Sequence, residues 1–130
     1  MDRLAADEIV AAAVTAAVPV CEVIANPRKY DGHEIDVVGI YGNAPHQRIL
    51  FDPNCASGEI ALRIAEGKDS FEQDKELQRE LQNKGAFRLK TVYRGRIEAE
   101  QVIQGCTEIA CYRLAINDAR LVSMEKTAVP

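Results

Sequence analysis

The stretch from Tyr30 to Gly42 constrains the fold more than any other part of the chain. Asp31-Gly32 predicts a turn, because both residue types favour the backbone conformations that tight turns need. The residues from His33 to Tyr41 then predict a long strand. This strand is expected to open a small β-barrel.

The apolar pattern of this strand is not a clean alternation. Ile35 and Val37 point to one face, whereas Val38 and Ile40 point to the other. A strand that changes its buried face has to bend or carry a bulge, and Gly39 marks the place. The sequence therefore predicts a bent first strand that both halves of a barrel share.

The remaining patterns predict a mainly β protein with one long helix. The expected elements are a short helix at 20–26, strands at 33–41, 48–52 and 59–65, a helix at 70–84, and strands at 86–97 and 112–122. Ser70 and Gln73 fit a capping box at the start of the long helix. Three strands, a helix and two more strands, with glycines at bends in the first and fourth strands, predict a five-stranded OB-fold-like barrel preceded by a short helix.

The length of 130 residues predicts one folded domain. We expect an Ala-rich N-terminal helix or tail at 1–18, the OB-fold-like domain at 19–123 and a C-terminal tail at 124–130. Because the chain has no Trp and few aromatic residues, its core is expected to be mostly aliphatic.

The net charge of −4 and the pI of about 5.2 argue against tight non-specific binding to a polyanion, which needs a positive field. A local basic strip is still expected on the fourth strand and its neighbour, made of Arg88, Lys90, Arg94, Arg96 and Arg113. Since OB folds often bind oligonucleotides, this strip predicts single-stranded nucleic-acid binding as an alternative function. Candidate aromatic residues for base stacking, each equally suited to the core, are Tyr41, Phe51 and Tyr93.

Four cysteines allow two disulfides, for which we expect the pairs Cys21–Cys55 and Cys106–Cys111. The first would join the short helix to the end of the second strand, and the chain-entropy model gives it roughly 3–4 kcal/mol. The second would brace the connection before the last strand. Free thiols packed in the core are the alternative.

No pattern in the chain predicts catalysis. It contains no nucleophile motif, HExxH, P-loop or GxGxxG, and its acidic residues are too scattered for a calcium loop. A zinc site formed by cysteines with His33 or His46 stays open, although no CxxC pair is present. We therefore expect no catalytic residue, no cofactor and no metal site.

Several segments resemble small bacterial OB-fold-like proteins of uncharacterised function. Val20–Pro27, Tyr30–Gly32 and Val37–Gly39 are similar to the opening of those proteins, and Leu50–Cys55 is similar to their second strand and its following cysteine. The resemblance covers roughly residues 18–123. It implies the same fold and an exported location, and no catalytic residues carry over from it.

The expected compartment depends on whether a signal peptide has been removed. The apolar run Ile9–Val18 is too short to span a bilayer, which takes roughly 20 apolar residues. Asp2, Asp7 and Glu8 precede it where a signal peptide carries positive charge. We expect a periplasmic or exported protein if a signal peptide has been removed, and a cytoplasmic protein otherwise.

These patterns predict a non-enzymatic binding or structural module that recognises a protein or an envelope component. One alternative is a single-stranded nucleic-acid binder that uses the basic strip. The other is a small cysteine-based metal or redox protein. The partner is unidentified at this point, and the oligomeric state is open.

Overall fold

The computed structural model describes residues 16–44, 47–55, 58–82, 87–106, 108 and 111–128. Its strands are β1 (Val18–Pro19), β2 (Glu34–Ala44), β3 (Gln47–Phe51), β4 (Ile60–Ile64), β5 (Phe87–Gln101) and β6 (Tyr112–Ala128). Its helices are α2 (Val20–Ala25), α3 (Pro27–Tyr30) and α4 (Lys68–Gln82). The protein is mainly β, as the sequence predicts.

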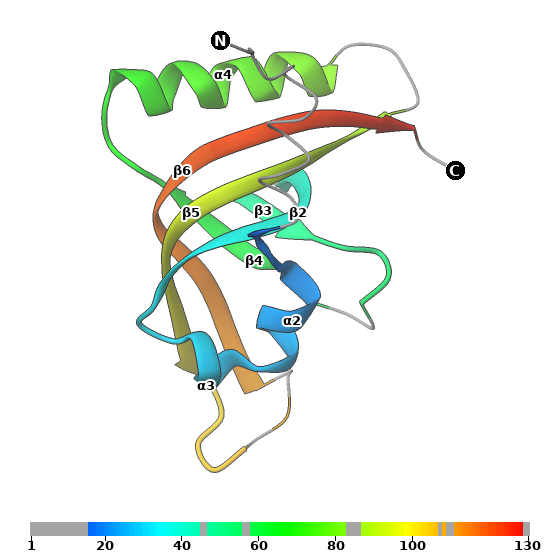
Figure 1. Cartoon of the computed structure of the whole chain (residues 1–130). Coiled ribbons are helices and arrows are strands. Elements are labelled where there is room, and N and C mark those ends of the chain that lie inside the picture. Colours follow the sequence, from blue (N-terminus) through cyan, green and yellow to red (C-terminus); the bar gives the residue numbers. More distant parts are fainter. Residues whose placement is uncertain are drawn as a thin grey trace, which may run out of the picture.

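Five of the strands close into a ring (Figure 1). The sheet has the order β1-β2-β3-β4-β6-β5, and β2 also pairs with β5, which closes the ring. Pairing around the ring is antiparallel except between β4 and β6, which run parallel. The predicted order of three strands, a helix and two strands is found, with α4 between β4 and β5.

Both halves of the ring share β2. Its residues Glu34–Ile40 pair with β5, and its residues Ile40–Ala44 pair with β3. The short strand β1 pairs in parallel with Val37 and Val38, on the stretch of β2 that β3 does not reach. The prediction of a shared first strand is confirmed.

The buried face of β2 does not change at Gly39, which corrects one expectation. Val37 and Tyr41, on either side of Gly39, both belong to the core inside the ring. Val38 lies on the opposite face in a second apolar cluster, with Ala17. Apolar residues therefore occur on both faces because both faces are covered.

The strands β5 and β6 extend further than their sequence patterns predict. They pair from Phe87 and Ala128 at one end to Gln101 and Tyr112 at the other. The predicted tail at 124–130 is corrected for residues 124–128, whose backbone pairs with β5. The apolar pattern of β5 slips at Thr91 and Val92 because the polar Thr91 is buried, whereas Val92 lies on the other face in the second apolar cluster with Val38. The register shifts next to Val92 and around Gly95 place the extra residues in β6.

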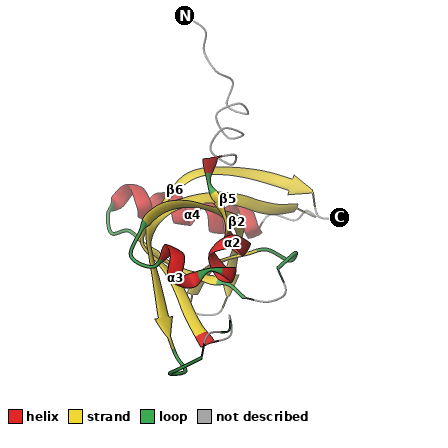
Figure 2. Ribbon diagram, turned by 60° about the horizontal axis from the view of Figure 1, so that its bottom comes forward, coloured by secondary structure: helices red, strands yellow, loops and turns green. Residues whose placement is uncertain are grey.

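The helix α4 begins earlier than the predicted capping box. Its first residue is Lys68, and the N–H of Phe71 already donates to the carbonyl of Gly67 at 3.1 Å. Ser70 therefore lies inside the first turn, and the predicted end at Lys84 lies outside the described residues. Figures 1 and 2 show α4 at one end of the ring and α2 and α3 at the other.

The core is largely aliphatic, as expected, but it also contains two tyrosines. Tyr41 and Tyr93 are each 2% exposed, and their ring centroids lie 6.5 Å apart. Most of the predicted N-terminal helix or tail, residues 1–15, lies outside the described residues. In the part of the chain that the structure describes, no helix is long and apolar enough to cross a membrane.

Candidate functional site

A groove of about 1140 Å³ runs along β4 and β6, and we call it the β4–β6 groove. It is lined mainly by residues 61–68 and 112–115, by Glu98, Glu100 and Val102, and by Phe71 at the start of α4. Because β4 and β6 run parallel and β5 runs against them, Val102 and Phe71 come at opposite ends of the groove.

Small side chains at neighbouring positions make the hollow. Ala61 of β4 pairs with Ala115 of β6, and Ala115 also pairs with Glu98 of β5. Neighbouring strands lie about 4.8 Å apart, so two adjacent alanines leave a shallow trough between longer side chains. The alternation of apolar residues in the predicted strand at 59–65 already placed Ala61 away from the core. Nothing in the sequence indicated that Ala115 would lie beside it.

One rim of the groove is a hydrogen-bonded cluster of three side chains. Arg63 forms an ion pair with Glu98 and donates to the side-chain oxygen of Asn117 at 2.8 Å. The Asn117 amide donates in turn to Glu98 at 3.0 Å. The hydrogen bonds that Glu98 accepts from Asn117 and from Arg63, together with the charge of Arg63, hold the pKa of the Glu98 carboxyl below its usual value.

A second polar cluster ties the start of α4 to the ring. Asp74 is 8% exposed and accepts hydrogen bonds from Tyr41 Oη at 3.1 Å, from Arg48 Nη2 at 2.9 Å and from Gln78 Nε2 at 3.0 Å. Burial and the Asp74 carboxylate raise the pKa of Tyr41. Sequence reasoning missed this cluster, because its members come from β2, β3 and α4 and share no motif.

The opposite end of the groove carries an exposed apolar side chain, Val102. Val102 is 43% exposed, and its N–H donates to the carbonyl of Cys111 at 2.7 Å. Gln101 Nε2 donates to the carbonyl of Cys106 at 2.6 Å, and the disulfide Cys106–Cys111 closes the connection. The backbone of Val102 is therefore tied to Cys111, which the disulfide joins to Cys106.

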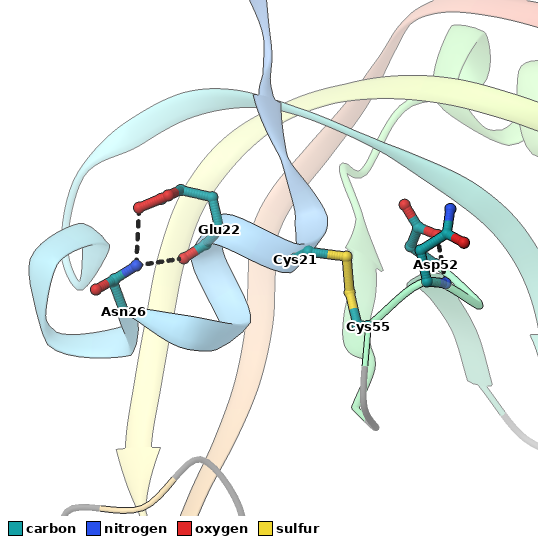
Figure 3. Close-up of a disulfide and its surroundings, with 6 residues drawn as sticks. Cys21, Glu22, Asn26, Asp52 and Cys55 are labelled. Atoms are coloured by element: carbon teal, nitrogen blue, oxygen red, sulfur yellow. Dashed lines mark hydrogen bonds between the residues drawn. A yellow bond between two sulfur atoms is a disulfide. The ribbon is translucent and has the colours of Figure 1, made fainter.

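Both predicted disulfide pairs are present. The Cα atoms of Cys21 and Cys55 lie 5.6 Å apart, and those of Cys106 and Cys111 lie 5.8 Å apart. Figure 3 shows the first pair joining α2 to the segment after β3. All four cysteines are paired, so none offers a free thiol to a metal. Among the described residues, the exposed His33 belongs to no group that could hold a metal ion. Disulfides are typical of oxidising compartments.

No protein-family model, curated protein or solved structure matches this chain significantly. The function has to be argued from the groove, the disulfides and the basic strip themselves.

The basic strip occupies one face of β5. Leu89, Tyr93 and Ile97 belong to the core, so the residues that alternate with them face outward, and these are Arg88, Lys90, Arg94 and Arg96. Arg113 is separate from them, because it pairs in the ladder with Glu100, beyond Glu98. Four of the five predicted residues are therefore brought together.

Acidic residues interrupt the strip. Arg94 forms a two-pronged pair with Asp36, at 2.7 and 3.1 Å, which raises the pKa of Arg94. Arg96 lies opposite Glu34, and Lys90 lies opposite Glu125. Among the candidate stacking residues, Tyr41 and Tyr93 are inside the core and Phe51 is half-buried. This face offers little of the positive field or aromatic surface that a single strand needs.

Proposed function

We propose that this protein is a non-enzymatic binding module, which takes an extended segment of a partner protein in the β4–β6 groove. One observation carries the proposal: an alanine-floored groove of about 1140 Å³ with exposed apolar side chains along it. Phe71 is 60% exposed and Val102 is 43% exposed, and both line the groove. Exposed apolar side chains in a concave site mark an interaction surface.

The fold supports this assignment. We interpret the ring as an OB fold, because its strand order, its parallel β4–β6 pair and the helix between the third and fourth ring strands agree with that architecture. OB folds bind ligands on the face of their second and third strands, which here are β3 and β4. Residues of β3 and β4 line the groove, together with Val102 at the β5–β6 connection.

The charges of the groove favour a polypeptide over a polyanion. Among the described lining residues the cationic ones are Arg48, Arg63, Lys68 and Arg113, and the anionic ones are Glu59, Glu66, Asp74, Glu98 and Glu100. Such a mixed lining lacks the positive field on which nucleic-acid affinity depends. Its internal ion pairs instead give the groove fixed walls, which lower the entropic cost of binding.

Two further proposals concern the location of the protein and an alternative ligand. The two disulfides favour an exported or periplasmic location, in line with the resemblance to exported OB-fold-like proteins. Single-stranded nucleic-acid binding through Arg88, Lys90, Arg94 and Arg96 remains the alternative, since these four residues do share one face.

Amide chemical shifts of the labelled full chain test the proposal. A pool of ten-residue peptides of mixed sequence should shift the amides of Ala61 and Ala115. The variant Ala61→Gln fills the groove and should weaken these shifts, whereas Val122→Gln, at a 40% exposed position that does not line the groove, should not. Circular dichroism checks that both variants fold.

The same experiment separates the alternatives. An oligothymidine that shifts Arg88–Arg96 at low salt, with no response to peptides, would support nucleic-acid binding instead. If no peptide in the pool shifts the groove amides, protein recognition in this groove is wrong.

A further inference from the structure

We propose that the β4–β6 groove selects an extended partner segment with a Lys or Arg and an aliphatic side chain two positions apart. This inference rests on the binding function proposed above and names the chemistry of the partner. It depends on the end of the groove that contains Val102, where an uncompensated negative charge lies next to an exposed apolar side chain.

Most of the charges in the groove are already neutralised by each other. Arg63 is paired with Glu98, and Arg48 is paired with Asp74. At the α4 end, the charges of Glu66 and Lys68 balance in number. The net charge of the groove is therefore decided at the other end.

At the Val102 end, two carboxylates flank one guanidinium. Glu100 lies directly opposite Arg113 in the β5–β6 ladder. Ala61 pairs with Ala115 in parallel, so Glu59, two residues before Ala61, comes level with Arg113 from the other side. Among the described residues these three side chains form no ion pairs like those on the rim, and Glu59 accepts only a 3.5 Å hydrogen bond from Gln47. Among the residues that line the groove, this end therefore has one carboxylate more than it has guanidinium groups, which a cationic side chain would compensate. Arg28, which donates to Tyr112 Oη at 2.6 Å, is not one of the lining residues.

The spacing of Glu100 and Val102 sets the spacing in the ligand. Both residues line the groove: Glu100 is in β5, and Val102 follows the last residue of β5, with its N–H bonded to the Cys111 carbonyl at 2.7 Å. Alternate residues of an extended chain project to the same side about 6.7 Å apart. A segment lying extended in the groove can therefore place a cation at Glu100 and an aliphatic group at Val102 when the two stand two positions apart, in either order.

The apolar contact has a preformed base. The Val102 N–H is held by the Cys111 carbonyl at 2.7 Å, and the neighbouring Ile103 is 57% exposed. An aliphatic side chain bound here would contact Val102, whose backbone is already held by this hydrogen bond, which lowers the conformational entropy lost on binding.

Three peptides, each a repeat of four residues, test the inference on the oxidised full chain. The first repeats Lys-Ser-Val-Ser, which puts Lys and Val on the same side. The second replaces Lys by Glu, and the third has the residues of the first in the order Lys-Val-Ser-Ser. We expect the first to shift the amides of Ala61, Ala115 and Val102 most strongly and to have the lowest Kd.

Glu100→Gln should weaken binding of the first peptide about two- to fivefold, the range for an exposed ion pair. The matched control is Glu34→Gln, an exposed glutamate on β2 outside the groove, which should leave the Kd unchanged. If the Glu peptide binds as tightly as the Lys peptide and shifts the same amides, the inferred chemistry is wrong while the groove remains a binding site. If none of the peptides shifts these amides, protein recognition in the groove fails as well.

Discussion

At the scale of single residues, Gly95 has the least room for an added side chain among the glycines that the structure describes. A Cβ atom there would overlap Ile116 Cγ2 and would lie 2.6 Å from the carbonyl oxygen of Asn117. On the facing strand, Asp118 adopts a left-handed backbone with φ of 54°, next to the register shift. The close approach of β5 and β6 at this bend is possible because residue 95 has no side chain.

Gly95→Ala should therefore lower the free energy of unfolding by about 1–3 kcal/mol, the usual loss when a packed site is overfilled. Urea unfolding followed by circular dichroism measures it. Gly39→Ala is the comparison, because the nearest atoms to its Cβ would be Val20 side-chain atoms, at 3.1 and 3.2 Å, and the Phe51 carbonyl oxygen at 3.3 Å. An equal or greater loss for Gly39→Ala would contradict this ranking.

The two buried tyrosines predict instability in alkali. Burial raises the pKa of both phenols, and the Asp74 carboxylate raises that of Tyr41 further. In the unfolded chain they ionise around the ordinary value of 10.0, whereas in the folded protein they stay neutral. The free energy of unfolding is therefore expected to be unaffected by these groups below that pH and to fall as the pH rises above it.

Tyrosinate absorbance measured against pH tests this expectation. Tyr41 and Tyr93 should ionise at the pH at which the circular dichroism signal of the folded protein is lost. Tyr41→Phe should remove part of the rise in tyrosinate absorbance at that pH. Ionisation of both phenols before any unfolding would show that they are accessible in the folded protein.

At the scale of elements, the attachment of α4 depends on a few specific contacts. Leu77 is buried in the core, Asp74 binds Tyr41 and Arg48, and Lys126 of β6 pairs with Glu80 at 2.5 Å. Leu77 and Leu81 are the apolar side chains of α4 that pack on the core, and the polar contacts supplement them. Because Arg48 and Asp74 also line the groove, these contacts hold one end of the proposed site in shape.

Asp74→Ala should lower the free energy of unfolding by about 1–3 kcal/mol, because it leaves the buried Tyr41 hydroxyl without its acceptor. Glu76→Ala on the same helix is the control. The Glu76 partner is Arg79, and both side chains are largely exposed, so its loss should be under about 0.5 kcal/mol. Thermal unfolding compares the two, and equal shifts in Tm would contradict the role given to Asp74.

At the scale of the whole molecule, the two disulfides constrain very different lengths of chain. Cys21 and Cys55 are 34 residues apart, whereas Cys106 and Cys111 are 5 residues apart. In the chain-entropy model the stabilisation grows with the length of the closed loop. The first pair should therefore contribute more to global stability, while the second acts on the connection beside the groove.

Replacing Cys21 and Cys55 together by Ser should lower the free energy of unfolding by about 4 kcal/mol, and replacing Cys106 and Cys111 by about 2 kcal/mol. Urea unfolding of the two double variants measures the difference. A larger loss for the Cys106–Cys111 variant would mean that native-state contacts, rather than loop length, dominate.

Much of the architecture could be predicted because it follows from local patterns. The shared strand β2, the order of the five ring strands with α4, and the cysteine pairs were predicted correctly, whereas β1 and α3 were not predicted. The predicted end of the last strand was wrong, because residues 124–128 have no strong apolar alternation and are held by backbone pairing to β5. Such pairing depends on a distant strand, which the local pattern does not report.

By itself the sequence determined the five ring strands, the glycines within the first and fourth of them and the two cysteine pairs, because each depends on residue type and spacing along the chain. Only the tertiary structure decided the groove. Ala61 and Ala115 are ordinary small residues until the parallel register of β4 and β6 makes them neighbours. The same holds for Asp74 with Arg48, since contacts between distant segments are set by strand register and helix placement.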